Sequence, residues 1–353
     1  MQEGVFRVAL RPEDGSGTVD QFLRRKNSLK DKESELSLEE FEVPDMDAAM
    51  SALNNAEADI ILMSGEEWAN IDDRTGLEIV AVFPRREPTW VMISDDKPEY
   101  LPRNAIIICP HKLVRRQMRR ARRDAHTMSV EDAIEKFGAP EDEDWSGLVP
   151  WLSELLGKGE IDAFIIDRGR WGLAGIRNRR HTLGLQRNQR DRAHFIPPTF
   201  SGFTLLVSRS GFPSGQFSTL HDWVSESALK TEYNLWNGIS PDNRDLIAIH
   251  AEQRGVGAIL REAEQNEDLQ LQESLLDIEG RVITGGTRIE IRMETVSANG
   301  WRTVGLERTA PLDFAYEESI RMIVEWKNLM EVVAEKHVDP NNPETNSQFF
   351  KLA

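Results

Sequence analysis

The sequence is poor in cysteine, in long apolar runs and in positive charge. Cys109 is the single cysteine among 353 residues, so an internal disulfide framework and a cysteine-rich metal site are both excluded. No apolar run approaches the roughly 18 residues that a membrane-spanning helix needs. The first residues lack a basic segment followed by a long apolar stretch, so we expect no signal peptide. Together with 29% charged residues and a mean hydropathy of −0.48, this predicts a soluble cytoplasmic protein with no membrane partner and no metal.

The shortage of positive charge bears on possible partners. The net charge is −17, which argues against nucleic acid because phosphate binding needs a basic surface. Acidic residues gather in segments 31–47 and 131–144, and basic residues in segments 112–123 and 177–192. An acidic exterior with a local concentration of arginine suits a small anion held inside a cleft, although acidity also serves solubility alone.

The order of apolar segments predicts two similar α/β units. In the first, strands at 5–10, 39–43, 58–63 and 77–83 alternate with helices at 18–29 and 47–55, the pattern of a doubly wound sheet. In the second, ADIILMSGEEW (58–68) is echoed by IDAFIIDRGRW (161–171). Further strands are expected at 90–93, 105–109 and 203–208, and helices from about 113, at 130–137 and at 150–156.

The last third of the chain reads differently. Segment 211–241 is less regular, and a long helix is expected at 243–263. Strands at 288–296 and 301–307 form a hairpin across the turn dipeptide Asn299–Gly300, and a helix follows at 314–333. We therefore predict domain 1 at 1–86 and 197–215, domain 2 at 87–196, an α+β domain 3 at 240–337, and a loose tail at 338–353.

An arginine-rich helix is expected after the buried strand that ends at Cys109. Arg115 and Arg116 lie in its first turn, where cations face the positive end of the helix dipole and cost roughly 0.3–1 kcal/mol each. A bound anion would offset this cost, and open α/β sheets bind ligands at the carboxyl ends of their strands. The alternative is a solvated, arginine-rich helix face.

Six segments in collinear order resemble the porphobilinogen deaminase (hydroxymethylbilane synthase) family. They are RVALR (7–11), ALNNAEADIILMSGEEW (52–68), LPRNAIIICPHKLVRRQ (101–117), KGEIDAFIIDRGRWGLAGI (158–176), IPPTFSGFTLLVSR (196–209) and LERTAP (306–311). The resemblance runs from about residue 6 to residue 333. It implies an α/β protein with two periplasmic-binding-protein-like doubly wound domains and a small C-terminal α+β domain.

The resemblance implies a monomeric transferase of tetrapyrrole and heme biosynthesis that binds carboxylated pyrroles. Arg11, Arg115 and Arg116 match the family's substrate-binding arginines, and each guanidinium can hold a carboxylate through two parallel N–H bonds. His111 and Lys112 beside them complete the expected substrate site. Glu67 stands where the family has its catalytic aspartate. Ion pairs between domains are the alternative role of the arginines, and exposure at a strand end is the alternative for Glu67.

The departures from the family concern its cofactor, a dipyrromethane held by a cysteine in domain 3. The corresponding segment 264–274 has no cysteine. Cys109 is then either an alternative attachment point or a buried strand residue. The family's flap is also missing, and Glu66 replaces its lysine. Two other functions therefore stay open: a non-catalytic binding protein for a small anion or a linear tetrapyrrole, and an interaction protein that docks through segment 211–241.

Overall fold

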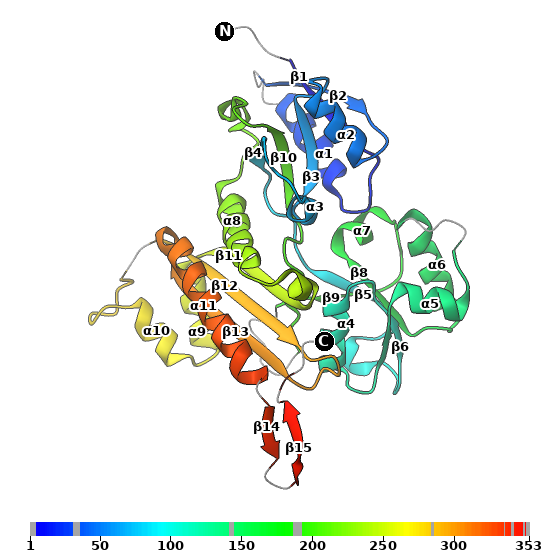
Figure 1. The fold of residues 1–353 in the computed structure, drawn as a ribbon, viewed down its shortest axis with the longest axis vertical. Helices are drawn as coiled ribbons and strands as arrows, with labels where there is room; N and C mark the ends of the chain where they lie inside the picture. The colour runs from blue at the N-terminus through cyan, green and yellow to red at the C-terminus, as the bar shows by residue number, and fades with distance from the viewer. Residues whose placement is uncertain are drawn as a thin grey trace.

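The computed structural model describes residues 5–30, 36–140, 145–185, 193–283, 286–334, 336–339, 342–348 and 350. It has three parts, which we call lobe 1, lobe 2 and the third domain (Figure 1). The acidic segments 31–47 and 131–144 and the basic segment 177–192 lie partly outside the described residues. Within them, every helix is too short or too polar to cross a membrane.

Lobe 1 is a five-stranded sheet with helices on both faces. Its sheet has the order β2-β1-β3-β10-β4, in which β1 runs parallel to β2 and β3 while β10 runs antiparallel to β3 and β4. Its elements are β1 (Val5–Leu10), α1 (Thr18–Lys30), β2 (Ser37–Glu42), α2 (Met46–Asn54), β3 (Ile60–Ser64), α3 (Gly65–Asn70), β4 (Leu77–Val82) and β10 (Thr204–Arg209).

Lobe 2 repeats the arrangement of lobe 1. Its sheet has the order β7-β6-β8-β5-β9, with β6 parallel to β7 and β8, and β5 antiparallel to β8 and β9. Its elements are β5 (Trp90–Ile93), η1 (Pro98–Tyr100), β6 (Ile106–Ile108), α4 (Lys112–Ala121), β7 (His126–Met128), α5 (Val130–Phe137), α6 (Trp145–Gly157), β8 (Ala163–Asp167), α7 (Arg168–Leu173) and β9 (Arg180–Leu183).

The strand orders of the two lobes match position by position, so β3 and α3 correspond to β8 and α7. This explains the sequence echo, because both strands are central and buried on both faces and therefore need continuous apolar residues. In lobe 1 the antiparallel strand β10 follows lobe 2 in the chain, whereas in lobe 2 the antiparallel strand β5 comes first. The predicted fold class, two periplasmic-binding-protein-like α/β domains plus an α+β domain, is confirmed.

The third domain is built on a three-stranded antiparallel sheet in the order β11-β12-β13. Helices α8 and α11 pack on one face of the sheet. Its elements are α8 (Trp223–Asn237), η3 (Pro241–Leu246), β11 (Ile247–Gly255), α9 (Val256–Gln265), α10 (Leu269–Leu275), β12 (Thr287–Val296), β13 (Thr303–Pro311), η4 (Leu312–Phe314) and α11 (Ala315–Ala334). β14 (Lys336–Asp339) and β15 (Asn342–Gln348) pair beyond it. The η2 turn (Ser214–Phe217), which precedes α8, packs against lobe 1.

Two secondary-structure predictions in this part are wrong. Segment 243–263 is not one helix, because its first half is β11, in which Ile247, Ile249 and Ala251 face the apolar core on alternate positions. Nine residues of β11 pair with β12, and this pairing overrides the helical spacing. Segment 211–241 is not irregular, because it contains the 15-residue helix α8, whose start is capped by the Asp222 side chain.

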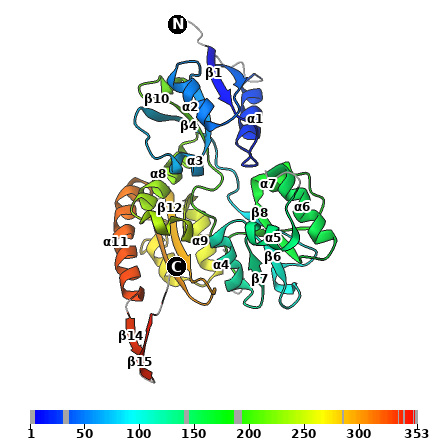
Figure 2. The ribbon, with the colours of Figure 1, turned by 45° about the vertical axis from the view of Figure 1, so that its right-hand side comes forward.

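The third domain contacts the two lobes in different ways. With lobe 1 it shares one continuous apolar core through α8, which we call the apolar junction; it joins Met63 and Trp68 of lobe 1, Leu235 and Trp236 of α8, and Ile291 of β12. With lobe 2 the contact is between α4 and the β12–β13 end of the sheet. Figure 2 shows α8 between lobe 1 and the third domain, and α4 alongside the third domain.

Candidate functional site

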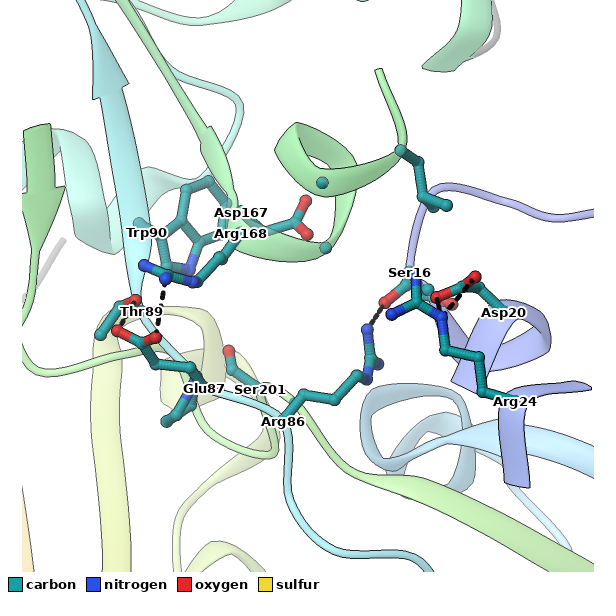
Figure 3. A pocket seen from close by; sticks show the side chains of 16 residues that line it. Ser16, Asp20, Arg24, Arg86, Glu87, Thr89, Trp90, Asp167, Arg168 and Ser201 are labelled. Atoms are coloured by element: carbon teal, nitrogen blue, oxygen red, sulfur yellow. Dashed lines mark hydrogen bonds and ion pairs between the residues drawn. The ribbon is translucent and has the colours of Figure 1, made fainter. Parts of the chain in front are cut away.

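A cavity of about 250 Å³ lies between the lobes. Segments 83–89 and 184–203 connect the lobes, and we call them the crossovers. The cavity is lined by the first residues of α1, by both crossovers and by the first turn of α7, as Figure 3 shows. A site between lobes that are joined by two crossovers can open and close by hinge motion.

The lobes touch at one edge of this cavity. Gly169 of α7 faces the loop of lobe 1 that precedes α1, and a Cβ atom at Gly169 would stand 2.6 Å from the carbonyl oxygen of Ser16. Any side chain at this position would push the two lobes apart, because real Cβ atoms do not approach backbone so closely. Glycine at 169 thus permits the closed arrangement.

Two residues that line the cavity each carry a buried hydrogen-bond donor without an acceptor from the described residues. Arg86 of the first crossover donates from Nη1 to the carbonyl oxygen of Ser16, but its buried Nε has no partner. Trp90, at the start of β5, is only 7% exposed, and its indole N–H also has no acceptor. A buried donor without an acceptor costs about 1–3 kcal/mol. Both donors therefore fit a ligand that brings an oxygen acceptor.

Two carboxylates, one from each lobe, lie close together at the site. Asp167 ends β8 and lines the cavity, whereas Glu66 is the second residue of α3, two positions beyond Ser64, the residue of lobe 1 that corresponds to Asp167. Loss of hydration among nearby protein atoms, and next the negative charge of Asp167, raise the pKa of Glu66 to about 7, although its side chain is exposed on one side. Ser201 Oγ donates a hydrogen bond to the Glu66 carboxyl at 3.5 Å. Burial also raises the pKa of Asp167, while Arg170 partly offsets this effect. Such a pair favours a bound cation, which would relieve the repulsion.

Of the predicted site residues, the structure brings Arg11 and Glu67 together. Arg11 holds the Glu67 carboxylate with Nη1 at 2.7 Å and Nη2 at 3.0 Å. Glu67 also accepts from the backbone N–H of Ser64 at 2.8 Å, within a capping box that starts α3. Both side chains are therefore used within lobe 1, and neither lines the cavity.

The predicted residues of lobe 2 cluster at the start of α4, and none of them lines the cavity. Arg115 donates to the carbonyl oxygens of Cys109 at 2.7 Å and Pro110 at 2.8 Å. His111 Nδ1 accepts from the backbone N–H of Leu113 at 3.2 Å and caps the helix, and burial lowers the pKa of His111 to about 4. Lys112 is exposed. These contacts stabilise the turn between β6 and α4.

Arg116 points to the third domain instead of to Arg11. It is 4% exposed, and its Nη1 donates to the carbonyl oxygen of Val296 at 3.1 Å. The alternative that the arginines serve contacts between domains is thus the arrangement observed for this residue. The predicted convergence of Arg11, Arg115 and Arg116 on one cleft is absent from the described structure.

The residues that do line the cavity were missed from the sequence. The position of Asp167 was visible in the echo between SGEEW and DRGRW, because Asp167 ends the strand of the repeat in lobe 2 as Ser64 does in lobe 1. Arg86 and Trp90 carried no such signal, since a crossover has no periodic pattern. Among the described residues, no three His, Cys, Asp or Glu side chains converge on a point where a metal ion could bind.

No family model matches the chain, and no curated protein matches its sequence. Several solved structures are similar. Lipoprotein Tp32 from Treponema pallidum is 13% identical with a TM-score of 0.34, and the alignment covers 62% of this chain and 90% of Tp32. A putative methionine-binding lipoprotein from Bacillus subtilis is 13% identical with a TM-score of 0.35, covering 63% and 92%. An ABC transporter periplasmic substrate-binding protein from Coxiella burnetii is 14% identical with a TM-score of 0.38, covering 65% and 97%.

These comparisons correct four predictions. Several of the similar structures are methionine-binding or periplasmic substrate-binding proteins and not porphobilinogen deaminases, so the predicted family is wrong, and so are the transferase activity and the place in heme biosynthesis. The dipyrromethane cofactor is wrong for the same reason. The cytoplasmic location is also wrong, because several of the similar proteins are lipoproteins.

The geometry gives a physical reason for the correction of the cofactor. Cys109 is fully buried, and burial raises the pKa of its thiol to about 12, so it offers neither access nor a thiolate for attachment. Segment 264–274 lies at the end of α9 and in α10 and contains no cysteine.

Proposed function

We propose that the chain is a non-catalytic binding protein whose lobes close on a small molecule that carries a carboxylate and a protonated amino group. The observation that carries this proposal is Trp90, a buried indole N–H that lines the cavity between the lobes without an acceptor. A ligand carboxylate would accept from Trp90 Nε1 and Arg86 Nε. Bonds from a cationic donor to a carboxylate are about twice as strong as neutral ones.

The acidic side of the site supports a cationic group on the same ligand. Asp167 lines the cavity, and Figure 3 shows its carboxylate and the Arg86 side chain facing the same open space. Glu66 adds a second negative charge close to Asp167. An ammonium group bound here would stabilise both ionised carboxylates.

The size of the cavity supports a ligand of amino-acid size. Its volume of about 250 Å³ lies below the roughly 300–1,000 Å³ of pockets that hold drug-sized molecules. The four rings of a linear tetrapyrrole exceed this space. A compact zwitterion suits both the volume and the charges.

The test is calorimetric titration and thermal shift of the whole chain with matched sets of three compounds: an amino acid, the same acid without its amino group, and the same amine without its carboxylate. We expect the amino acids to bind and raise the melting temperature, and the two truncated compounds to bind at least tenfold more weakly. Failure of every compound to bind would contradict the proposal.

Two variants locate the site. Trp90→Phe keeps the ring and removes the N–H, and Arg86→Gln removes the charge; each should weaken binding roughly 10- to 100-fold, as expected for a lost bond to a charged group. The matched controls are Trp223→Phe and Arg103→Gln on the exposed surface, which should bind as the native protein does. Native affinity in both site variants would place the ligand elsewhere.

A further inference from the structure

The third domain holds the crossovers through one buried carboxylate. Glu232 of α8 is completely buried and accepts from Arg85 Nη1 at 2.7 Å, from the backbone N–H of Phe200 at 2.8 Å and from that of Ala251 at 3.0 Å. Arg85 belongs to the first crossover and Phe200 to the second. Both connections between the lobes are therefore tied to the apolar junction, and lobe 1, the crossovers and the third domain form one body.

Lobe 2 is attached to this body mainly by polar contacts. From α4, Arg116 donates to Val296 O at 3.1 Å, Arg119 to Ala298 O at 2.7 Å and Arg120 to Glu294 at 2.7 Å. We call these contacts the polar junction. Its apolar part is small, consisting of Leu113, Ile196 and Ala248 with Leu185 packed against them.

The two junctions differ in the free energy that would be needed to separate their surfaces. Water can replace hydrogen bonds to arginine and to carbonyl oxygens at a small net cost, because each bond in the protein is exchanged for one to solvent. Exposing the apolar junction would instead bring a continuous core into contact with water. If the lobes move, the polar junction is the contact that separates.

We propose that the polar junction is a releasable latch: when α4 leaves Glu294 and the 297–302 turn, lobe 2 swings about the crossovers and opens the cavity. Trp90 and Asp167 move with lobe 2, whereas Ser16 stays with lobe 1, so opening separates the two walls of the site. The strength of the latch then sets the fraction of molecules that are closed. Its effect on ligand affinity rests on the proposed function, but the release itself does not.

The test measures the distance between the lobes in the ligand-free whole chain. Spin labels are placed on Glu57→Cys in lobe 1 and Glu135→Cys in lobe 2, both exposed positions, while the buried Cys109 stays unlabelled. Glu294→Gln removes the charge that Arg120 binds, and should increase the population with a long inter-lobe distance at least threefold. The matched control is Glu325→Gln, which takes the partner from Arg308 on the third-domain surface and should leave the distances native.

Arg120→Gln removes the other partner of the pair, and its inter-lobe distances replace those of Glu294→Gln if the latter does not fold. Native distance distributions in a correctly folded variant would overturn the latch. In the variants, ligand affinity should fall by the same factor as the closed fraction. A chain that opens on latch release but binds none of the matched compounds would refute the proposed function and keep the latch.

Discussion

The two surfaces by which the third domain meets the lobes are of opposite kinds. The apolar junction buries aromatic and aliphatic side chains in a core that runs from the sheet of lobe 1 to the sheet of the third domain. The polar junction consists of arginines that donate to carbonyl oxygens and to Glu294. The difference teaches that three domains of similar size need not be equally free to move relative to one another. Lobe 1 and the third domain behave as one unit, and lobe 2 is the part that can move.

The largest effect is expected from Trp236→Ala, which breaks the apolar junction. Trp236 is 8% exposed, packs against the ring of Phe200 at 5.6 Å and has the Arg244 guanidinium 3.6 Å from its ring centre. Its removal should cost about 3–5 kcal/mol of unfolding free energy, measured by urea denaturation. Hydrogen exchange should rise together in lobe 1 and the third domain while lobe 2 stays protected. Equal loss of protection in lobe 2 would contradict the division of the molecule, and Tyr100→Ala, at an exposed aromatic residue, is the control.

Glu232→Gln tests the tie between the apolar junction and the crossovers. The substitution keeps the shape of the side chain but leaves the Arg85 charge buried without a counter-charge, which should cost about 3 kcal/mol. Glu154→Gln, which breaks an exposed pair with Lys158, should change the stability by less than about 0.5 kcal/mol. The same urea titrations measure both. A loss no larger than that of the control would show that Glu232 does not hold the crossovers.

Gly300→Ala weakens the polar junction from the third-domain side. Gly300 has φ +76°, and a Cβ atom there would stand 2.6 Å from the backbone of Arg119. Gly280 also has φ +76° but open space around it. Gly280→Ala should therefore report the backbone cost alone, about 1–2 kcal/mol, while Gly300→Ala should cost more and expose the amides of α4 to hydrogen exchange. Identical behaviour of the two variants would show that the turn does not press on α4.

The smallest effect concerns Glu66, which lies close to Asp167 of lobe 2. Since the pKa of Glu66 is raised from 4.5 to about 7, the folded state holds its proton more tightly than the unfolded state. Native stability should therefore fall, relative to Glu66→Gln, as the pH rises from about 4.5 through about 7. Melting curves at closely spaced pH values measure the difference. A constant difference across this range would place the Glu66 carboxyl in ordinary solvent.

The architecture was accessible from the sequence because it depends on local patterns. Central strands of a parallel sheet are buried on both faces, so β3 and β8 are continuous apolar runs that can be recognised in the sequence. The same pattern misled the family assignment, since buried strands and the turns after them look alike in every sheet of this type. For β11 the local pattern suited a helix as well as a strand, and only pairing with β12 distinguished them.

The candidate site was less accessible. Arginines were expected to mark the ligand, but Arg11 is satisfied by Glu67 and Arg116 by the third domain. A side chain's role depends on which partner lies within reach, and that partner is often more than 100 residues away in the chain. Arg86, in a crossover without periodicity, had nothing local to reveal that it faces a cavity.

By itself, the sequence determined the two repeated α/β lobes, the α+β character of the third domain and the absence of any disulfide, because residue type and spacing control these properties within a few turns or strands. The tertiary structure alone decided which charges are paired, where the cavity lies and which lobe is held by a shared core. These depend on distances between segments that no spacing along the chain encodes, since the crossovers bring both halves of the sequence to a single site.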